Sequence, residues 1–95
     1  MSYTVTYRHG KPNSHYRAMV HLALKEFDTS FVPDSSSSWI IDRKNHRWNI
    51  HGHINWHNED IDLWFDDSEI IDAIYEALYI AEEKVERIKH HKEHP

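Results

Sequence analysis

Apolar and polar residues alternate between residues 39 and 65 with a period of two. This period is typical of strands that bury one face of a sheet. Turn-forming polar residues interrupt the alternation at residues 43–46 and 57–60. The sequence therefore predicts three antiparallel strands joined by two hairpins. A turn at His51-Gly52, which would divide the middle strand in two, is the alternative interpretation.

The register of these hairpins follows from the side chains that would meet across them. In the first hairpin Asp42 faces Arg47, so that opposite charges are paired. In the second, Gly52 faces Phe65, whose ring can cover the glycine. A slip of one residue would move every apolar side chain to the wrong face, so the assignment of faces is strongly specified.

A short strand and an amphipathic helix precede this meander. Residues 3–8 are β-branched and aromatic and alternate in polarity, which predicts a half-buried strand. Residues 14–27 carry apolar positions at the helical period, and Asn13 or Ser14 can cap that helix. Residues 29–38 contain a proline and four consecutive serines, a composition that predicts a flexible loop.

The last helix is predicted from Asp66 onward, with Glu69 returning to the cap as in a capping box. If it extends to residue 91, it is about 36 Å long, whereas a small domain is about 30 Å wide. Its last turns should therefore overhang the core. We expect either a frayed tail over residues 89–95 or a homodimer that packs through this C-terminal helix.

The predicted elements follow one another in the order β-α-β-β-β-α. Both helices are amphipathic and the meander has one apolar face, so we expect an α+β fold. It should be a two-layer sandwich, an antiparallel sheet with two helices on one face and its other face open. Ninety-five residues are enough for a single domain, residues 1–95, with one modest core.

The amino-acid composition excludes several kinds of functional site. The chain has no cysteine, which excludes disulfides, thiolate metal sites and cysteine nucleophiles. Twelve Trp, Tyr and Phe residues supply apolar area for a core, so we expect no structural metal and no cofactor. With glycine only at Gly10 and Gly52, phosphate loops and dinucleotide motifs are absent, and catalysis is the weaker hypothesis. Without an N-terminal signal or a membrane span, we expect a cytoplasmic protein.

Charge is unevenly distributed along the chain. The net charge is −5, but ten acidic residues and no Lys or Arg occur between residues 48 and 83. Such a stretch repels phosphate backbones and favours a protein partner with a basic surface, so nucleic acid is the less favoured partner. A solvated face that only aids solubility is the simpler alternative.

The open sheet face should carry an aromatic anchor among polar residues, which is typical of a protein-binding patch. Trp64 and Ile40 are the apolar residues expected there, unless the N-terminal strand or the serine loop covers them. Together with the acidic stretch they give the predicted partner-binding set: Trp64, Asp62, Asp66, Glu69, Asp72, Glu76 and Ile40.

A metal site is a weaker hypothesis. His51 and His53 lie two residues apart on one strand, with Cα atoms about 6.6 Å apart, and the predicted register places Asp66 opposite His51 as a third ligand. The alternative is that these histidines are half-polar fillers of an exposed face.

These observations favour a small non-catalytic protein-binding module whose acidic surface docks on a basic partner. It would act as an inhibitor or adaptor, in analogy with small acidic phage and mobile-element proteins that inhibit nucleic-acid enzymes by imitating phosphates. One alternative is single-stranded nucleic-acid binding on the open sheet, with Trp64 stacking on bases and Arg8 and Arg47 meeting phosphates. A metal-binding protein that uses the His-Gly-His strand is the second alternative.

Overall fold

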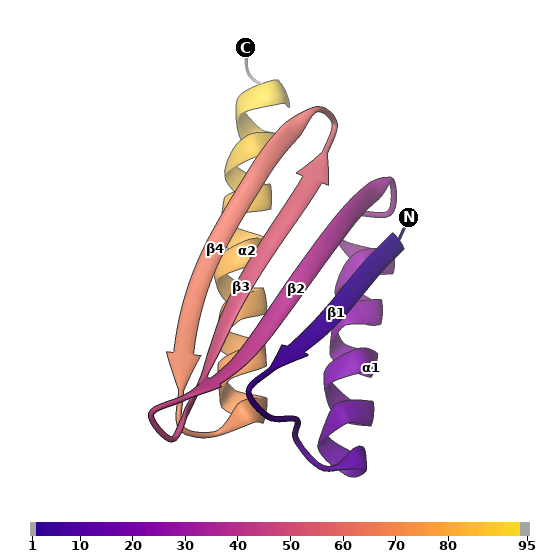
Figure 1. Ribbon diagram of the computed structural model, residues 1–95. Coiled ribbons are helices and arrows are strands. Elements are labelled where there is room, and N and C mark those ends of the chain that lie inside the picture. The colour runs from indigo at the N-terminus through magenta and orange to yellow at the C-terminus, as the bar shows by residue number, and fades with distance from the viewer. Residues whose placement is uncertain (1, 94–95) are drawn as a thin grey trace.

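The computed structural model describes residues 2–93, which form a four-stranded sheet with two helices on one face (Figure 1). The strands follow one another across the sheet in the order β1-β2-β3-β4. The predicted α+β sandwich with the order β-α-β-β-β-α is confirmed. The elements are β1 Ser2–Arg8, α1 Ser14–Ser30, β2 Ser35–Lys44, β3 Arg47–Trp56, β4 Glu59–Asp67 and α2 Ile70–Glu93.

The sheet is mixed, whereas an antiparallel sheet was predicted. The pairs β2–β3 and β3–β4 are antiparallel, but β1 runs parallel to β2. β1 and β2 are neighbours connected through α1, and a crossover helix returns the chain so that the two strands point in the same direction. The sequence analysis identified these elements but not that β1 pairs with β2.

Both hairpins turn over only two residues, Asn45-His46 and His57-Asn58, and all four have positive φ, between 51° and 63°. Two central residues at positive φ define the type I′ turn, whose twist suits paired strands and which asparagine tolerates well. The predicted four-residue turns were therefore too long, and β3 is one continuous strand.

The shorter turns shift the register by two residues, which leaves every side chain on its predicted face. Asp42 lies opposite Asn49 instead of Arg47. Gly52 lies between Trp39 and Leu63 instead of opposite Phe65. A large ring does cover the glycine, but it belongs to Trp39: a Cβ on Gly52 would lie 2.5 Å from Cζ3 of that ring.

The loop predicted over residues 29–38 is wrong at both ends, because α1 extends to Ser30 and β2 begins at Ser35. Ser35 is buried, and its hydroxyl donates to the Val32 carbonyl at 2.7 Å and to the Asp28 carboxylate at 3.5 Å. The backbone of residues 36–38 pairs with β1 on one side and β3 on the other. Serine composition disfavours burial, but pairing on both sides satisfies the backbone groups of this segment.

The helix caps agree in part with the sequence. Asn13 caps α1, because its side-chain oxygen accepts from the backbone N–H of Tyr16 at 3.0 Å. Before α2, the backbone N–H of Glu69 donates to the Asp67 carboxylate at 3.0 Å. The predicted capping box with Asp66 is wrong, since the Asp66 carboxylate pairs with Arg47 and Asp67 accepts from Glu69 in its place.

α2 does not extend beyond the core as far as expected. The molecule is elongated, with principal extents of 44 × 22 × 17 Å, so the long strands accompany the helix over most of its length. Val85 is fully buried and Ile88 packs against the core. Residues 89–93 are helical instead of frayed, and residues 94 and 95 lie outside the described residues. A homodimer through α2 stays a prediction.

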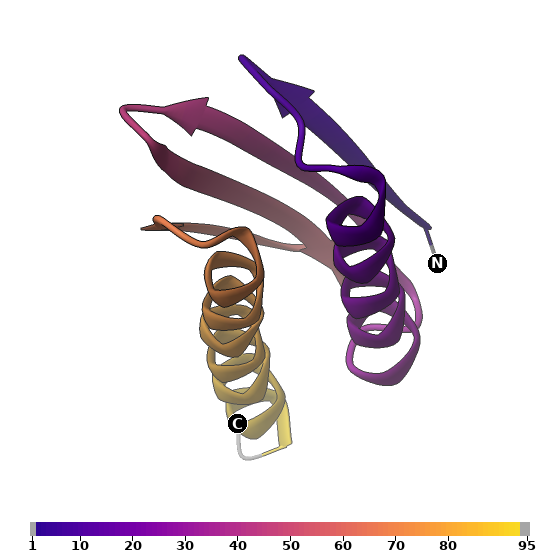
Figure 2. The same cartoon turned by 90° about the horizontal axis from the view of Figure 1, so that it is seen from below.

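The core fills the space between the sheet and the helices (Figure 2). Within residues 2–93, neither helix has the apolar length that crossing a membrane requires. The large side chains that are fully buried come from both layers: Val20, Leu24, Val32, Trp39, Ile41, Ile50, Ile54, Leu63, Ile74 and Val85.

Candidate functional site

The sheet face opposite the helices carries an aromatic residue open to solvent. Thr6, Ile40, His51 and Trp64 pair in succession, so they form one row across all four strands. Trp64 is 67% exposed, and therefore neither β1 nor the serine segment covers it. Ile40 in the same row is half-buried. The structure thus presents Trp64 as a large exposed ring on a face whose other residues, apart from Ile40, are polar.

The Trp64 ring stacks on the ring of a histidine from the neighbouring strand β3. His51 stacks on it with ring centroids 4.6 Å apart and planes inclined by 3°. Nε2 of His51 lies 3.0 Å from Oδ1 of Asp62, which fixes the imidazole in turn. A ring held in this way loses little conformational freedom on binding, which favours its use as an anchor.

Asp62 is the centre of a small ionic cluster. The same Oδ1 atom lies 2.9 Å from Nδ1 of His53, and Nε2 of His53 lies 3.4 Å from Oδ1 of Asp60. The hydrogen bond with Asp62 raises the pKa of His53, and the hydrogen bonds from His53 and His51 lower the pKa of Asp62. The cluster therefore favours a protonated His53 beside an ionised carboxylate.

The predicted metal ligands do not come together. The two-residue change of register places Trp64 opposite His51, where Asp66 was expected. Asp66 instead forms an ion pair with Arg47 near the opposite end of the strand. Among the side chains of residues 2–90, no three from His, Asp or Glu are placed to hold a metal ion. The facing nitrogens of His51 and His53 are bound to Asp62 instead.

Cations gather at one end of the sheet, where the β1–α1 loop meets the β2–β3 hairpin (Figure 1). A Cβ on Gly10 would lie 3.3 Å from Cβ of Arg43, which shows how closely the two segments approach. We call this region the basic end: Arg8, Lys11, Arg43, Lys44 and Arg47. Sequence reasoning singled out only Arg8 and Arg47, because residues 8–11 and 43–47 are far apart in the chain.

Most acidic residues of the sheet face have partners within the chain. Asp42 lies 2.8 Å from Nδ1 of His9, and Asp66 is paired with Arg47. By contrast, within the described part of the chain no carboxylate forms an ion pair with the side chain of Arg8, Lys11 or Lys44. These three charges are therefore available to a partner, in contrast to the paired carboxylates.

The residues predicted to bind a partner do not form one surface. Trp64, Asp62, Asp66 and Ile40 belong to the open sheet face. Asp72 and Glu76 lie on the exposed side of α2 in the other layer, and Glu69 directly precedes that helix. The acidic stretch is continuous in sequence, but the fold distributes it over both layers.

Comparison with known proteins shows the fold. No protein-family model matches the chain, and no curated protein matches it. The N-terminal domain of Thermus thermophilus Protein Y is similar in structure with a TM-score of 0.74 and 14% identity, covering 90% of this chain and 94% of that domain. A ribosomal subunit interface protein from Coxiella burnetii is similar with a TM-score of 0.80 and 8% identity, covering 95% of this chain and 99% of that protein.

Proposed function

We propose that this chain is a non-catalytic binding protein that associates with the ribosome. The observation that carries the proposal is the match to a ribosomal subunit interface protein over nearly the whole of both chains. Because one fold serves many functions, the surface must also offer suitable chemistry. The basic end and the exposed Trp64 supply two such features.

The basic end supports contact with ribosomal RNA. Phosphates are bound through clustered Lys and Arg, and Arg8, Lys11 and Lys44 form no ion pair with a described residue. Unpaired bases stack on exposed aromatic rings, and Trp64 presents one, held by His51, on the same sheet face as Arg8. The carboxylates around Trp64 are largely paired with histidine or arginine, which weakens their repulsion of phosphates.

The ribosome differs from the partner that the sequence alone favoured. That partner was a basic protein, with nucleic acid as the less favoured choice, whereas a ribosome offers both RNA and protein. Docking of an acidic surface on a basic protein stays a proposal; it shares Trp64 and the open sheet face with the ribosome proposal, but its residues Asp72 and Glu76 lie on α2 in the other layer. Ribosome association would also agree with the predicted cytoplasmic location.

The test is sedimentation of the purified protein with purified ribosomes and separate ribosomal subunits of its own organism. We expect co-sedimentation that weakens as the salt concentration is raised. Lys and Arg side chains that bind phosphates release the counterions of the RNA, and this release is less favourable at high salt. Lys44→Glu should weaken binding about ten-fold and reduce the slope of log affinity against log salt by roughly 0.7 to 0.9.

Lys25→Glu is the matched control, since Lys25 is exposed on α1 in the other layer. It should bind as the original protein does. Absence of co-sedimentation at low salt, or equal losses in Lys44→Glu and Lys25→Glu, would contradict ribosome binding through the basic end.

A further inference from the structure

The middle of the open sheet face carries two histidines, His51 and His53 of β3. They are alternate residues of one strand, and Gly52 between them is buried toward the helices. Both histidine side chains are partly exposed. Histidine is the residue whose charge ordinarily changes between about pH 5 and pH 8. The charge of this part of the face therefore depends on pH.

The two histidines share one carboxylate of β4. Nε2 of His51 and Nδ1 of His53 lie 3.0 Å and 2.9 Å from Oδ1 of Asp62. Nε2 of His53 also lies 3.4 Å from Oδ1 of Asp60. The hydrogen bond with Asp62 raises the pKa of His53. These two histidines and two aspartates form the Asp62 cluster, which lies next to Trp64 on the same face.

The aspartates of the Asp62 cluster have only histidines as ionic partners. Among the side chains that the structure describes, neither Asp60 nor Asp62 forms an ion pair with Lys or Arg. The Lys and Arg residues of the open face lie in other rows of the sheet, at the basic end. The negative charge beside Trp64 is therefore balanced only when the histidines are protonated.

The neighbouring elements add no other group that titrates near neutral pH. From α2, Nζ of Lys84 donates to the backbone carbonyl of Asp62 at 3.0 Å, and Arg87 lines a shallow hollow with that aspartate. Lysine and arginine ordinarily keep their charge between pH 6 and pH 8. On β2, the residue opposite His53 is Ser38, which does not titrate. The change of charge with pH thus comes from the two histidines.

This change of charge decides how the Asp62 cluster acts on a phosphate. Neutral imidazoles leave both aspartates with uncompensated negative charge, which repels phosphates, whereas two protonated imidazoles balance that charge. His51 stacks on Trp64 with ring centroids 4.6 Å apart. A nucleotide whose base stacks on the Trp64 ring therefore has its phosphates within reach of the cluster.

We propose that His51 and His53, when protonated, admit the phosphates of single-stranded RNA whose bases stack on Trp64, so that RNA binds more tightly at pH 6 than at pH 8. The inference rests on the proposed function, because it concerns the same sheet face and the RNA part of the same partner. It adds the side chains that regulate the contact, and it gives the His-Gly-His strand a role in binding.

The experiment measures fluorescence anisotropy of a labelled single-stranded oligouridylate without a terminal phosphate, at low salt and at pH 6 and pH 8. No group of this probe titrates between these pH values if the dye is insensitive to pH, so a change in affinity comes from the protein. We expect binding about ten-fold tighter at pH 6 than at pH 8, because the histidines gain charge as pH falls over this range.

Two variants of the Asp62 cluster test the origin of that difference. His53→Gln should weaken binding about five-fold at pH 6 and less than about two-fold at pH 8, because it replaces a side chain that is charged mainly at the lower pH. Asp62→Asn should strengthen binding about three-fold at pH 8, because it removes a charge that repels phosphates. Both side chains are partly exposed, so the variants should stay folded.

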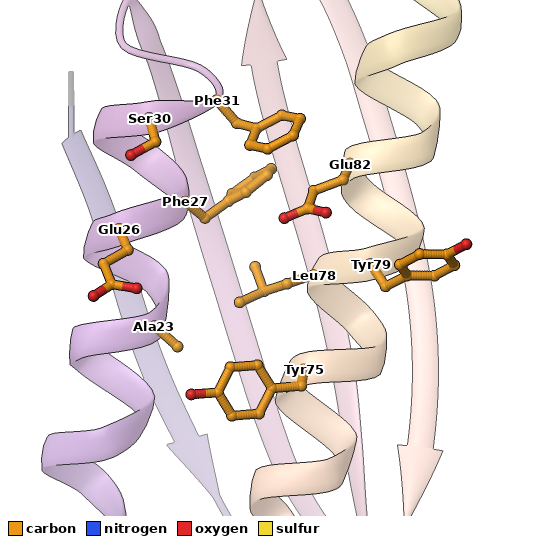
Figure 3. A pocket seen from close by; sticks show the side chains of 9 residues that line it. All are labelled: Ala23, Glu26, Phe27, Ser30, Phe31, Tyr75, Leu78, Tyr79 and Glu82. Atoms are coloured by element: carbon orange, nitrogen blue, oxygen red, sulfur yellow. The ribbon is translucent and has the colours of Figure 1, made fainter.

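Matched controls in the helical layer separate the Asp62 cluster from the overall charge of the protein. His21→Gln removes an exposed histidine of α1. Glu26→Gln removes an exposed carboxylate on the outer side of the same helix (Figure 3). Both controls should bind the oligonucleotide as the original protein does at each pH.

Three outcomes would overturn the proposal: no binding of the oligonucleotide at pH 6, equal affinity at both pH values, or equal losses in His53→Gln and His21→Gln. Sedimentation with ribosomes at pH 6 tests the proposed function separately. If the oligonucleotide binds as expected but the protein does not sediment with ribosomes, the histidine-dependent RNA contact is supported and ribosome association is contradicted.

Discussion

The two faces of β3 differ in the polarity and the burial of their side chains. Ile50, Gly52 and Ile54 point into the core and are buried, while His51 and His53 point to the open face and remain partly exposed. The buried face packs against α1 and α2, and the open face holds Trp64 and the Asp62 cluster. Alternate residues of β3 therefore have different roles. One set packs in the core, and the other set belongs to the candidate site. Changes on the two faces should therefore separate stability from binding.

The largest effect should come from Ile54→Ala on the buried face. Ile54 is fully buried, so the change removes apolar burial and leaves a cavity. We expect a loss of about 3 to 4 kcal/mol in the free energy of unfolding, measured by urea denaturation. The neighbouring change Asn55→Ala on the other face should cost under about 0.5 kcal/mol. Similar losses for both variants would show that the faces are not distinct.

Gly52→Ala should have the next largest effect, again on stability. The added Cβ would lie 2.5 Å from Cζ3 and 2.8 Å from Cε3 of Trp39, whose ring is buried and has little room to move. We expect a cost of about 2 to 3 kcal/mol from overpacking. In a Trp39→Leu background the same change should cost at least about 1 kcal/mol less. If the losses of stability in this double-mutant cycle are additive, the Trp39 ring is not the reason why residue 52 must be a glycine.

Trp64→Ala differs from the two preceding changes, because it should weaken binding more than it lowers stability. Its ring is exposed and packs mainly on His51, so the cost in stability should be about 0.5 to 1 kcal/mol. Binding to ribosomes should weaken about ten-fold if the ring stacks on a base. The measurement pairs urea denaturation with co-sedimentation, and unchanged co-sedimentation would remove Trp64 from the ribosome contact.

The smallest effect is a pH dependence of stability on the open face. The raised pKa of His53 means that its contribution is fully present below the ordinary value of 6.5 and is lost as pH rises through the raised pKa. The lowered pKa of Asp62 means that its contribution is present above 3.8 and is lost as pH falls through the lowered pKa. The pair should therefore stabilise most between about pH 4 and pH 6.5.

His53→Gln tests this pair because it removes the titrating group but keeps a polar side chain. The difference in unfolding free energy between the original protein and the variant should shrink from pH 6 to pH 8. Urea denaturation at a series of pH values gives that difference directly. A constant difference across this range would show that the His53–Asp62 contact does not contribute through its charge.

Part of the candidate site could be read from the pattern of residues. The alternation from residue 39 to residue 65 correctly assigned Trp64, Asp62 and the histidines to one face, although the register was wrong by two residues. That error kept the faces but replaced the partner of His51, and so it suggested Asp66 as a metal ligand instead of Trp64 as a stacking partner. The short turns were the missed signal, because asparagine tolerates positive φ in a two-residue loop.

By itself, the sequence determined the order of the elements, the buried and open faces of the meander and the start of α1, because side-chain period and helix capping are local properties. Only the tertiary structure decided that β1 runs parallel to β2, and that residues 8–11 and 43–47 meet in a basic end. It also decided that Phe27 of α1 and Leu78 of α2 line one hollow between the helices. These features depend on which elements pack side by side, and local patterns do not carry that information.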